Sequence, residues 1–278
     1  MAYAAEISRV NPTCFLFLVD QSGSMRRPFG RNSETKKSEG VADAINRLLY
    51  GLVLRCAGGQ DIVDRYYIGV IGYGTRVGSA LGGDLAGQGL VPVSQIGNHP
   101  LRIERRSKKV SDGAGGLVET TANFPVWIDP VAEGNKTPMC AALAEAKKTI
   151  GDFVGGCRGA FPPIVINVTD GQANDGDPEP EALALRNLAT EDGQVLLFNV
   201  HISVADEPPI QFPVDEARLP DKFARLLFRM SSPLPPKMLE EASEMGFDVA
   251  EGARGFVFNG DLVSVVQFLD IGTRHTSR

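Results

Sequence analysis

Short apolar runs alternate with amphipathic stretches along the chain. The runs Cys14–Val19, Tyr66–Tyr73, Ile164–Thr169 and Val195–Val204 show little polar alternation, which is typical of strands covered on both faces. The stretch Glu39–Cys56 instead spaces its apolar residues as one face of a helix does. This alternation of buried strands and helices predicts a doubly wound α/β domain.

The remaining elements follow from weaker signals. Further helices are expected at Met139–Phe153, Pro180–Glu191, Lys237–Glu244 and from Asp261 to about Leu269. Gly255–Phe258 is expected to be a last short strand, Thr75–Leu81 either a hairpin strand or a loop, and the Pro-rich Ala205–Asp221 a loop.

One long stretch of the sequence shows no clear pattern of secondary structure. Gly82 to Asn123 is rich in glycine and has poor helical periodicity, and an extended segment, Phe124–Ile128, follows it. We interpret residues 82–123 as an elaborated insertion with some local structure, such as a small hairpin, because structureless loops of that length are uncommon. Since neither repeats nor a clear linker occur, we expect a single domain over residues 1–278 with its core at about 12–270.

Charge and composition argue against some classes of function. The net charge of −6 argues against non-specific nucleic-acid binding, and the basic stretches Arg26–Lys37 and Arg102–Lys109 are interpreted as solvated loops. No apolar run approaches the ~20 residues of a membrane-spanning helix, so no membrane association is expected. The four cysteines are widely spaced, and the N-terminus lacks the pattern of a secretory signal. We therefore expect reduced thiols and a cytoplasmic location.

Oxygen-bearing side chains gather where the first buried strand ends. Asp20, Ser22 and Ser24 form D-Q-S-G-S directly after that strand. A period of two in a tight loop can aim three side chains at one point, and Gly23 gives the loop room to bend. Carboxylate and hydroxyl oxygens suit Mg²⁺, or Ca²⁺ or Mn²⁺, better than zinc.

Two further residues strengthen this pattern. Asp170 directly follows another buried strand, in V-T-D-G, and Thr137 opens a helix in K-T-P-M. In an open α/β sheet, ligands collect outside the carboxyl ends of the strands, so parallel strands would bring these segments to one edge. The competing interpretation is that Ser22, Ser24 and Asp170 only form turns and cap helices.

The five residues resemble a known motif. The sequence is similar to von Willebrand factor A domains, whose metal-ion-dependent adhesion site is D-x-S-x-S, then a Thr in a later loop, then an Asp after the next core strand. The resemblance covers roughly residues 12–270 and implies a mostly parallel six-stranded sheet with one antiparallel edge strand. It also implies that Ser22, Ser24 and Thr137 supply hydroxyls and that Asp20 and Asp170 bind the metal directly or through water.

The ligand charges indicate how such a site is used. The ligands are three neutral hydroxyls and two carboxylates. If one carboxylate reaches the metal through water, the divalent ion remains partly uncompensated, and an Asp or Glu of a partner protein can replace a water on it. We therefore expect a metal-dependent protein-binding module and not an enzyme. The family resemblance further implies the free-standing intracellular bacterial type, which acts in stress, signalling or defence complexes. The oligomeric state does not follow from the sequence.

Two alternatives stay open. One is a Mg²⁺-dependent hydrolase or phosphoryl-transfer enzyme, which the oxygen-rich site permits; none of the three histidines, including His201 in a buried run, stands beside a nucleophile in the sequence. The other is a structural subunit that the metal only stabilises. Near the site, Asp175 and Asp177 are interpreted as turn residues, and Trp127 as a core or edge anchor.

Overall fold

A mostly parallel sheet forms the centre of the molecule. The computed structural model describes residues 2–29, 34–59, 61–111, 117–202 and 208–260. In the described part, the parallel strands are, in spatial order, β14 (Phe256–Phe258), β12 (Leu196–His201), β9 (Ile164–Thr169), β1 (Thr13–Asp20) and β4 (Tyr66–Tyr73). Short antiparallel strands flank them: β5 (Val77–Ser79) and β6 (Val91–Pro92) on β4, and β13 (Ile210–Gln211) on β14.

The predicted fold class is therefore confirmed, with one correction at the sheet edges. We expected six strands with one antiparallel edge strand, whereas the described residues form eight strands, of which three are antiparallel. The added strands are only two or three residues long. β5 lies within Thr75–Leu81 and confirms the hairpin strand that was one of the two expected outcomes there. β6 and β13 are two residues long, too short to show an alternating pattern in the sequence.

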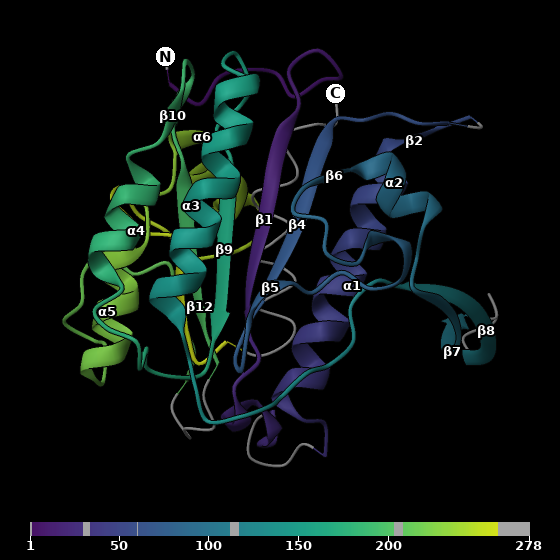
Figure 1. Cartoon of the computed structure of the whole chain (residues 1–278), viewed down its shortest axis with the longest axis horizontal. Coiled ribbons are helices and arrows are strands. Elements are labelled where there is room, and N and C mark those ends of the chain that lie inside the picture. The colour runs from purple at the N-terminus through teal and green to yellow at the C-terminus, as the bar shows by residue number, and fades with distance from the viewer. Residues whose placement is uncertain (1, 30–33, 60, 112–116, 203–207, 261–278) are drawn as a thin grey trace.

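Helices cover both faces of the sheet (Figure 1). One layer contains α1 (Lys37–Cys56), α2 (Val93–Asn98) and α6 (Pro236–Glu244), and the other contains α3 (Met139–Gly156), α4 (Glu179–Arg186) and α5 (Lys222–Met230). Along β1, Phe15 and Phe17 pack toward the α1 layer, and Leu16 and Leu18 toward the α3 layer. Because both faces of the strand are buried, its sequence is apolar throughout.

The helix ends differ from the prediction in several places. α1 begins two residues earlier than expected, and α4 ends at Arg186 because the chain then forms the small hairpin of β10 (Ala189–Thr190) and β11 (Gly193–Gln194). α5 was not predicted. Its start is fixed by Asp221, whose carboxylate accepts hydrogen bonds from two backbone N–H groups of the first turn. The expected helix from Asp261 lies outside the described residues.

The insertion is more ordered than its composition indicates. It contains the 3₁₀ turn η2 (Gly83–Leu85), β6 and α2, and the strands β7 (Arg102–Ser111) and β8 (Leu117–Val126) pair as a long hairpin that projects from the body (Figure 1). A second small hairpin, β2 (Ala57–Gly58) with β3 (Asp61–Ile62), lies between α1 and β4.

Salt bridges anchor the base of the projecting hairpin. Arg106 pairs with Asp43 of α1 and lies over the ring of Phe124, 3.7 Å from its centroid. Arg102 pairs with Asp129 and Glu104. The interpretation of Arg102–Lys109 as a solvated loop is therefore wrong, because the stretch belongs to strand β7 and both Arg102 and Arg106 form ion pairs.

Polar groups also lie inside the sheet. Tyr73 donates to Asn167 Oδ1 at 2.7 Å, Asn167 donates to Asn199 Oδ1 at 2.9 Å, and Asn199 donates to Ser231 Oγ at 3.0 Å. This set, which we name the polar row, crosses from β4 over β9 and β12 to the end of α5. Trp127 is buried as predicted and donates its indole N–H to the carbonyl of Ile96.

Candidate metal site

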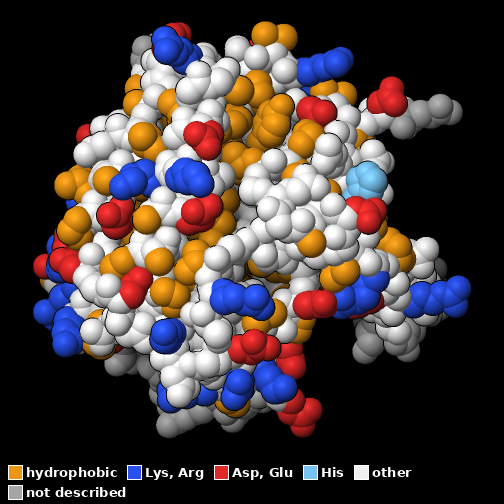
Figure 2. Space-filling view, in the orientation of Figure 1, with side chains coloured by type: hydrophobic (Ala, Val, Ile, Leu, Met, Phe, Trp, Pro, Cys, Tyr) orange, Lys and Arg blue, Asp and Glu red, His pale blue; other side chains and the backbone are white. Residues whose placement is uncertain are grey.

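The two predicted carboxylates lie at neighbouring strand ends. Asp20 is the last residue of β1, and Asp170 directly follows β9. These strands are adjacent and parallel, with Val19 opposite Val168, so both side chains reach the same edge of the sheet. This is the lower edge in Figure 1, where charged side chains gather in Figure 2. The requirement that the two strands run parallel is thus met.

Hydroxyl groups connect the first loop to Asp170. The hydroxyl oxygens of Ser22 and Ser24 are 2.9 Å apart, and Ser24 donates to Asp170 Oδ1 at 2.6 Å. Ser22 precedes the 3₁₀ turn η1 (Gly23–Arg26), but its side chain makes no capping hydrogen bond there. The interpretation of the two serines as cap residues therefore does not account for where their hydroxyls point.

Asp20 is held from two directions. Its Oδ1 accepts the backbone N–H of Ser22 at 2.8 Å, and its Oδ2 accepts the Thr169 hydroxyl at 2.7 Å. Burial raises the pKa of Asp20, the hydrogen bonds from Ser22 and Thr169 oppose that shift, and the charge of Asp170 adds to it. Each carboxylate oxygen keeps a further lone pair, so Asp20 can still accept from a metal-bound water. Thr169 was not foreseen from the sequence.

Thr137 comes to the site through its backbone. Its N–H donates to Asn174 Oδ1 at 3.0 Å, and its carbonyl accepts from the N–H of Asn174 at 3.2 Å. The residue is buried, but among the described residues no hydrogen bond joins its hydroxyl to the other four predicted ligands. The structure therefore places the Thr137 loop against the loop that follows Asp170, and leaves the role of its hydroxyl a prediction.

The Thr137 loop is also fastened to the D-Q-S-G-S loop. Glu133 donates its N–H to the Gln21 carbonyl at 2.7 Å, and Gly23 donates to the Gly134 carbonyl at 2.9 Å. A Cβ at Gly23 would lie 2.4 Å from that carbonyl oxygen. The glycine is thus needed for close contact between two loops, and not only for a bend as its position in the motif predicted.

A buried lysine joins the site. Lys37 Nζ donates to Asp170 Oδ2 at 2.7 Å and lies 3.4 Å from the carbonyl oxygen of Ile202. The side chains of Lys37 and Asp170 are only 3% and 1% exposed. The interpretation of Arg26–Lys37 as a solvated loop is therefore wrong for Lys37. A signal existed, since Lys37 stands four residues before Val41 and eight before Ile45, on the buried face of the same helix.

Two nearby acidic residues bind backbone N–H groups. Asp175 accepts hydrogen bonds from the backbone N–H groups of Cys140 and Ala141 at the start of α3, and Asp177 accepts from that of Glu179. Asp177 is thus a turn residue as predicted, whereas Asp175 caps the start of α3. Among the described residues, no three His, Cys, Asp or Glu side chains form a group that could hold a metal. A cation here therefore depends on hydroxyl ligands.

His201 lies at the end of β12, opposite Thr169. Its ring stacks on Phe258 with 5.0 Å between centroids, and its Nδ1 is buried without a hydrogen-bond partner among the described residues. Burial lowers the pKa of His201 to about 4, with Asp221 opposing and Lys37 adding to the shift. The imidazole is therefore neutral at neutral pH.

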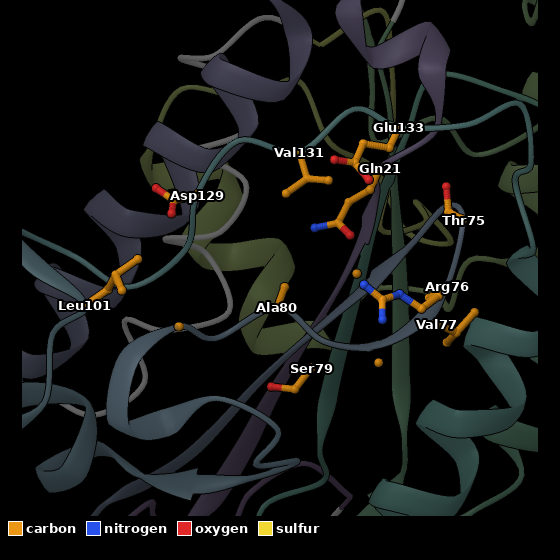
Figure 3. Close-up of a pocket in the computed structure, with 13 residues that line it drawn as sticks. Gln21, Thr75, Arg76, Val77, Ser79, Ala80, Leu101, Asp129, Val131 and Glu133 are labelled. Atoms are coloured by element: carbon orange, nitrogen blue, oxygen red, sulfur yellow. The ribbon is translucent and has the colours of Figure 1, made fainter.

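A cavity of about 550 Å³ opens beside the site. Its wall includes Gln21 and Glu133, which belong to the two fastened loops, and residues of β5. Figure 3 shows the guanidinium of Arg76 and the amide of Gln21 directed into it. Within the described part of the chain, Arg76 has no ion pair. The cavity is thus partly lined by polar groups, and it adjoins the predicted metal loop at Gln21.

Comparisons with known proteins match structures only. No family model and no curated protein matches the sequence. The chain aligns with proximal thread matrix protein 1 from the mussel byssus at a TM-score of 0.47 and 16% identity, over 96% of this chain and 48% of that one. A structure of the same mussel protein with a zinc-occupied MIDAS motif gives 0.46 and 14%, over the same shares. Manganese-loaded Plasmodium vivax TRAP protein gives 0.37 and 19%, over 91% and 73%.

The chain spans about half the length of the mussel structures. The fold described above rests on the strand order and the helix layers themselves. Among the described helices, none combines the length and the apolar character that crossing a membrane requires.

Proposed function

We propose that this chain is a von Willebrand factor A-type module that captures an acidic residue of a partner protein through a divalent cation. Asp20, Ser22, Ser24, Thr137 and Asp170 would hold the cation, with Mg²⁺ favoured and Mn²⁺ or Ca²⁺ possible. The observation that carries the proposal is the hydrogen-bonded path from Ser22 through Ser24 to Asp170 at the carboxyl edge of the sheet.

The spacing of these oxygens fits an octahedral ion. Neighbouring ligands at Mg–O distances of 2.0–2.1 Å are about 2.9 Å apart. The hydroxyl oxygens of Ser22 and Ser24 have that separation, and Ser24 Oγ to Asp170 Oδ1 is slightly shorter at 2.6 Å. When bound, the cation would supply an open coordination position that attracts a carboxylate.

The neighbouring cavity supports a protein partner. The partner residue that reaches the metal must bring its flanking residues over the adjacent loops, and the cavity beginning at Gln21 lies there. Arg76 can pair with a second acidic group of the partner. Asp129 and Glu133 also line the cavity, so we propose an extended partner segment that brings one acidic residue to the metal and a second one to Arg76.

We further propose a reducing, cytoplasmic setting in a bacterial stress, signalling or defence complex. All four cysteines are free thiols, and Cys14 and Cys56 are buried. Burial raises the pKa of the Cys56 thiol to about 11, which keeps it unreactive. Thiols in this state suit a compartment where disulfides do not form.

The test is a metal titration combined with partner capture. Wild type should bind Mg²⁺ in calorimetry and retain a protein from a bacterial lysate in Mg²⁺ but not in EDTA. Asp20→Ala should lose both properties, whereas Glu251→Ala, which removes an exposed carboxylate elsewhere, should keep both. Metal binding with no metal-dependent partner, together with strong thermal stabilisation by Mg²⁺, would favour the structural role instead.

The enzymatic alternative has its own assay. Phosphatase and nuclease substrates are incubated with the Mg²⁺-loaded protein. We expect no turnover. Turnover that disappears in Asp20→Ala would replace the binding proposal with a metal-assisted hydrolase.

A further inference from the structure

The Lys37–Asp170 ion pair lies inside the proposed metal site. Asp170 divides its two oxygens, with Oδ1 accepting from Ser24 at 2.6 Å and Oδ2 accepting from Lys37 at 2.7 Å. Only the Oδ1 side therefore faces the other proposed ligands. In this arrangement Asp170 can offer the cation, or a water on it, one oxygen and not two.

The position of Lys37 runs against local preference. It is the first residue of α1, where the positive end of the helix dipole disfavours a cation. Long charged side chains are also seldom buried without a partner. Lys37 nevertheless is buried at 3% side-chain exposure, and its ammonium reaches Asp170 and the Ile202 carbonyl oxygen. Its placement is therefore decided by the charge of the site.

Because Lys37 is buried, its positive charge is only weakly screened by solvent. An ion pair at the surface is screened by water and salt, whereas a pair this enclosed is screened much less. The ammonium also cannot swing into solvent without leaving the Asp170 carboxylate buried and unpaired. Lys37 is thus a fixed positive charge a few ångströms from where the cation would bind.

The formal charges of Asp20, Asp170 and Lys37 determine the net charge of the site when a cation is bound. Asp20 and Asp170 carry two negative charges and Lys37 one positive charge, so the protein presents a net charge of −1 to a divalent ion. The loaded site would carry a net charge of +1, which one carboxylate from outside neutralises. Without Lys37, the same ligands would neutralise the ion by themselves.

We infer that Lys37 couples metal binding to carboxylate capture. It weakens binding of the cation alone by repulsion and strengthens binding of the cation together with an external carboxylate. Because such coupling is reciprocal, the carboxylate tightens the metal by the same factor as the metal tightens the carboxylate. This inference rests on the proposed function and adds to it the condition that the site is filled by metal and partner together.

The experiment titrates Mn²⁺ into metal-free protein and measures free Mn²⁺ by electron paramagnetic resonance, with and without acetate as a stand-in for an Asp side chain. In wild type, saturating acetate should tighten Mn²⁺ binding at least about tenfold. Lys37→Gln, which keeps an N–H donor but no charge, should bind Mn²⁺ alone at least about tenfold more tightly and lose most of the acetate effect. Lys37→Arg keeps the charge and should behave as wild type.

The outcomes separate this inference from the proposed function. If wild type binds Mn²⁺, Asp20→Ala does not, and Lys37→Gln matches wild type with and without acetate, Lys37 has no coupling role although the metal site stands. If wild type binds no Mn²⁺ even in saturating acetate, the proposed function fails as well.

A further variant tests the inference even if loss of the Lys37 charge prevents folding. Lys37→Met removes the ion pair of Asp170, and we expect this variant to be unfolded in the absence of metal, as judged by circular dichroism. Millimolar Mg²⁺ should then restore the folded spectrum, because the ion replaces the missing ammonium beside Asp170. A protein that stays unfolded with Mg²⁺, or a folded one that binds Mn²⁺ no more tightly than wild type, contradicts the inference.

Discussion

The hydroxyl of Thr169 donates a 2.7 Å hydrogen bond to Asp20 Oδ2 and so joins the ends of two neighbouring parallel strands. This bond fixes the carboxylate that begins the D-Q-S-G-S motif. It also reduces the cost of burying that carboxylate, whose pKa burial raises.

Replacing Thr169 should therefore affect both stability and metal binding. Thr169→Val removes the donor while keeping the shape of the side chain, and we expect a loss of about 1–3 kcal/mol in the free energy of unfolding by urea. Mn²⁺ affinity should fall as Asp20 becomes free to rotate. Thr169→Ser keeps the hydroxyl and should stay near wild type. Equal stability of the Val and Ser variants would show that the bond is not important.

The contact between two loops at Gly23 gives a second prediction. Gly23→Ala would place a Cβ 2.4 Å from the Gly134 carbonyl oxygen, so the loops must separate. We expect a stability loss of about 1–3 kcal/mol and at least roughly tenfold weaker Mn²⁺ binding. The matched control is Gly171→Ala, next to Asp170, because a Cβ there has no neighbour within 4 Å. If both variants bind Mn²⁺ as wild type does, the fastening of the loops does not support the site.

Sequence patterns predicted this edge of the molecule well, because two independent signals coincide there. The buried runs that become β4 and β9 have the predicted limits, since a strand covered on both faces is apolar from end to end. The oxygen-bearing residues that follow β1 and β9 are then brought together by the parallel arrangement alone.

What the sequence did not reveal depends on contacts between distant residues. Lys37 pairs with Asp170 across 133 positions, and a lysine beside other basic residues looks like part of a solvated surface. The helix α5 follows Pro220 and a polar loop, so its start signal at Asp221 was read as part of the loop. Helical spacing could have placed Lys37 on the buried face of α1, but only the tertiary structure shows that Asp170 is its partner.

His201 predicts how stability changes with pH. Its pKa lies at about 4 in the folded protein, against 6.5 for an ordinary histidine. The folded state therefore binds this proton less readily than the unfolded state, so its stability contribution is complete above about pH 6.5 and declines as the pH falls toward 4. The loss should reach roughly 2 kcal/mol near pH 5.

Urea denaturation at several pH values between neutral and acidic checks this dependence. His201→Phe retains the ring that stacks on Phe258 and should lose roughly 2 kcal/mol less stability than wild type on going from pH 7 to about 5. His99→Phe, at an exposed position, is the control and should follow wild type. Parallel curves for wild type and His201→Phe would contradict the prediction.

The cavity predicts a variant that separates partner binding from metal binding. Arg76→Glu reverses the charge of one side chain in a cavity wall that already contains Asp129 and Glu133. A partner carboxylate at this position would be repelled, so the partner should bind at least about fivefold more weakly in Mg²⁺. The Mn²⁺ affinity should stay unchanged, because no proposed ligand is altered. Arg9→Glu makes the same charge change at an exposed residue that precedes β1, at the opposite end of that strand from Asp20. A partner that binds both variants equally does not use the cavity.

The polar row in the sheet has a consequence for how the site is assembled. If β9 or β12 paired one residue out of register, Asn167 or Asn199 would turn toward the opposite helix layer and lose its partners. Each group buried in that way would cost about 1–3 kcal/mol, so misaligned sheets are selected against during folding. The row thus favours correct alignment of β4, β9 and β12, and it fixes the end of β9, where Asp170 follows, before any ion arrives.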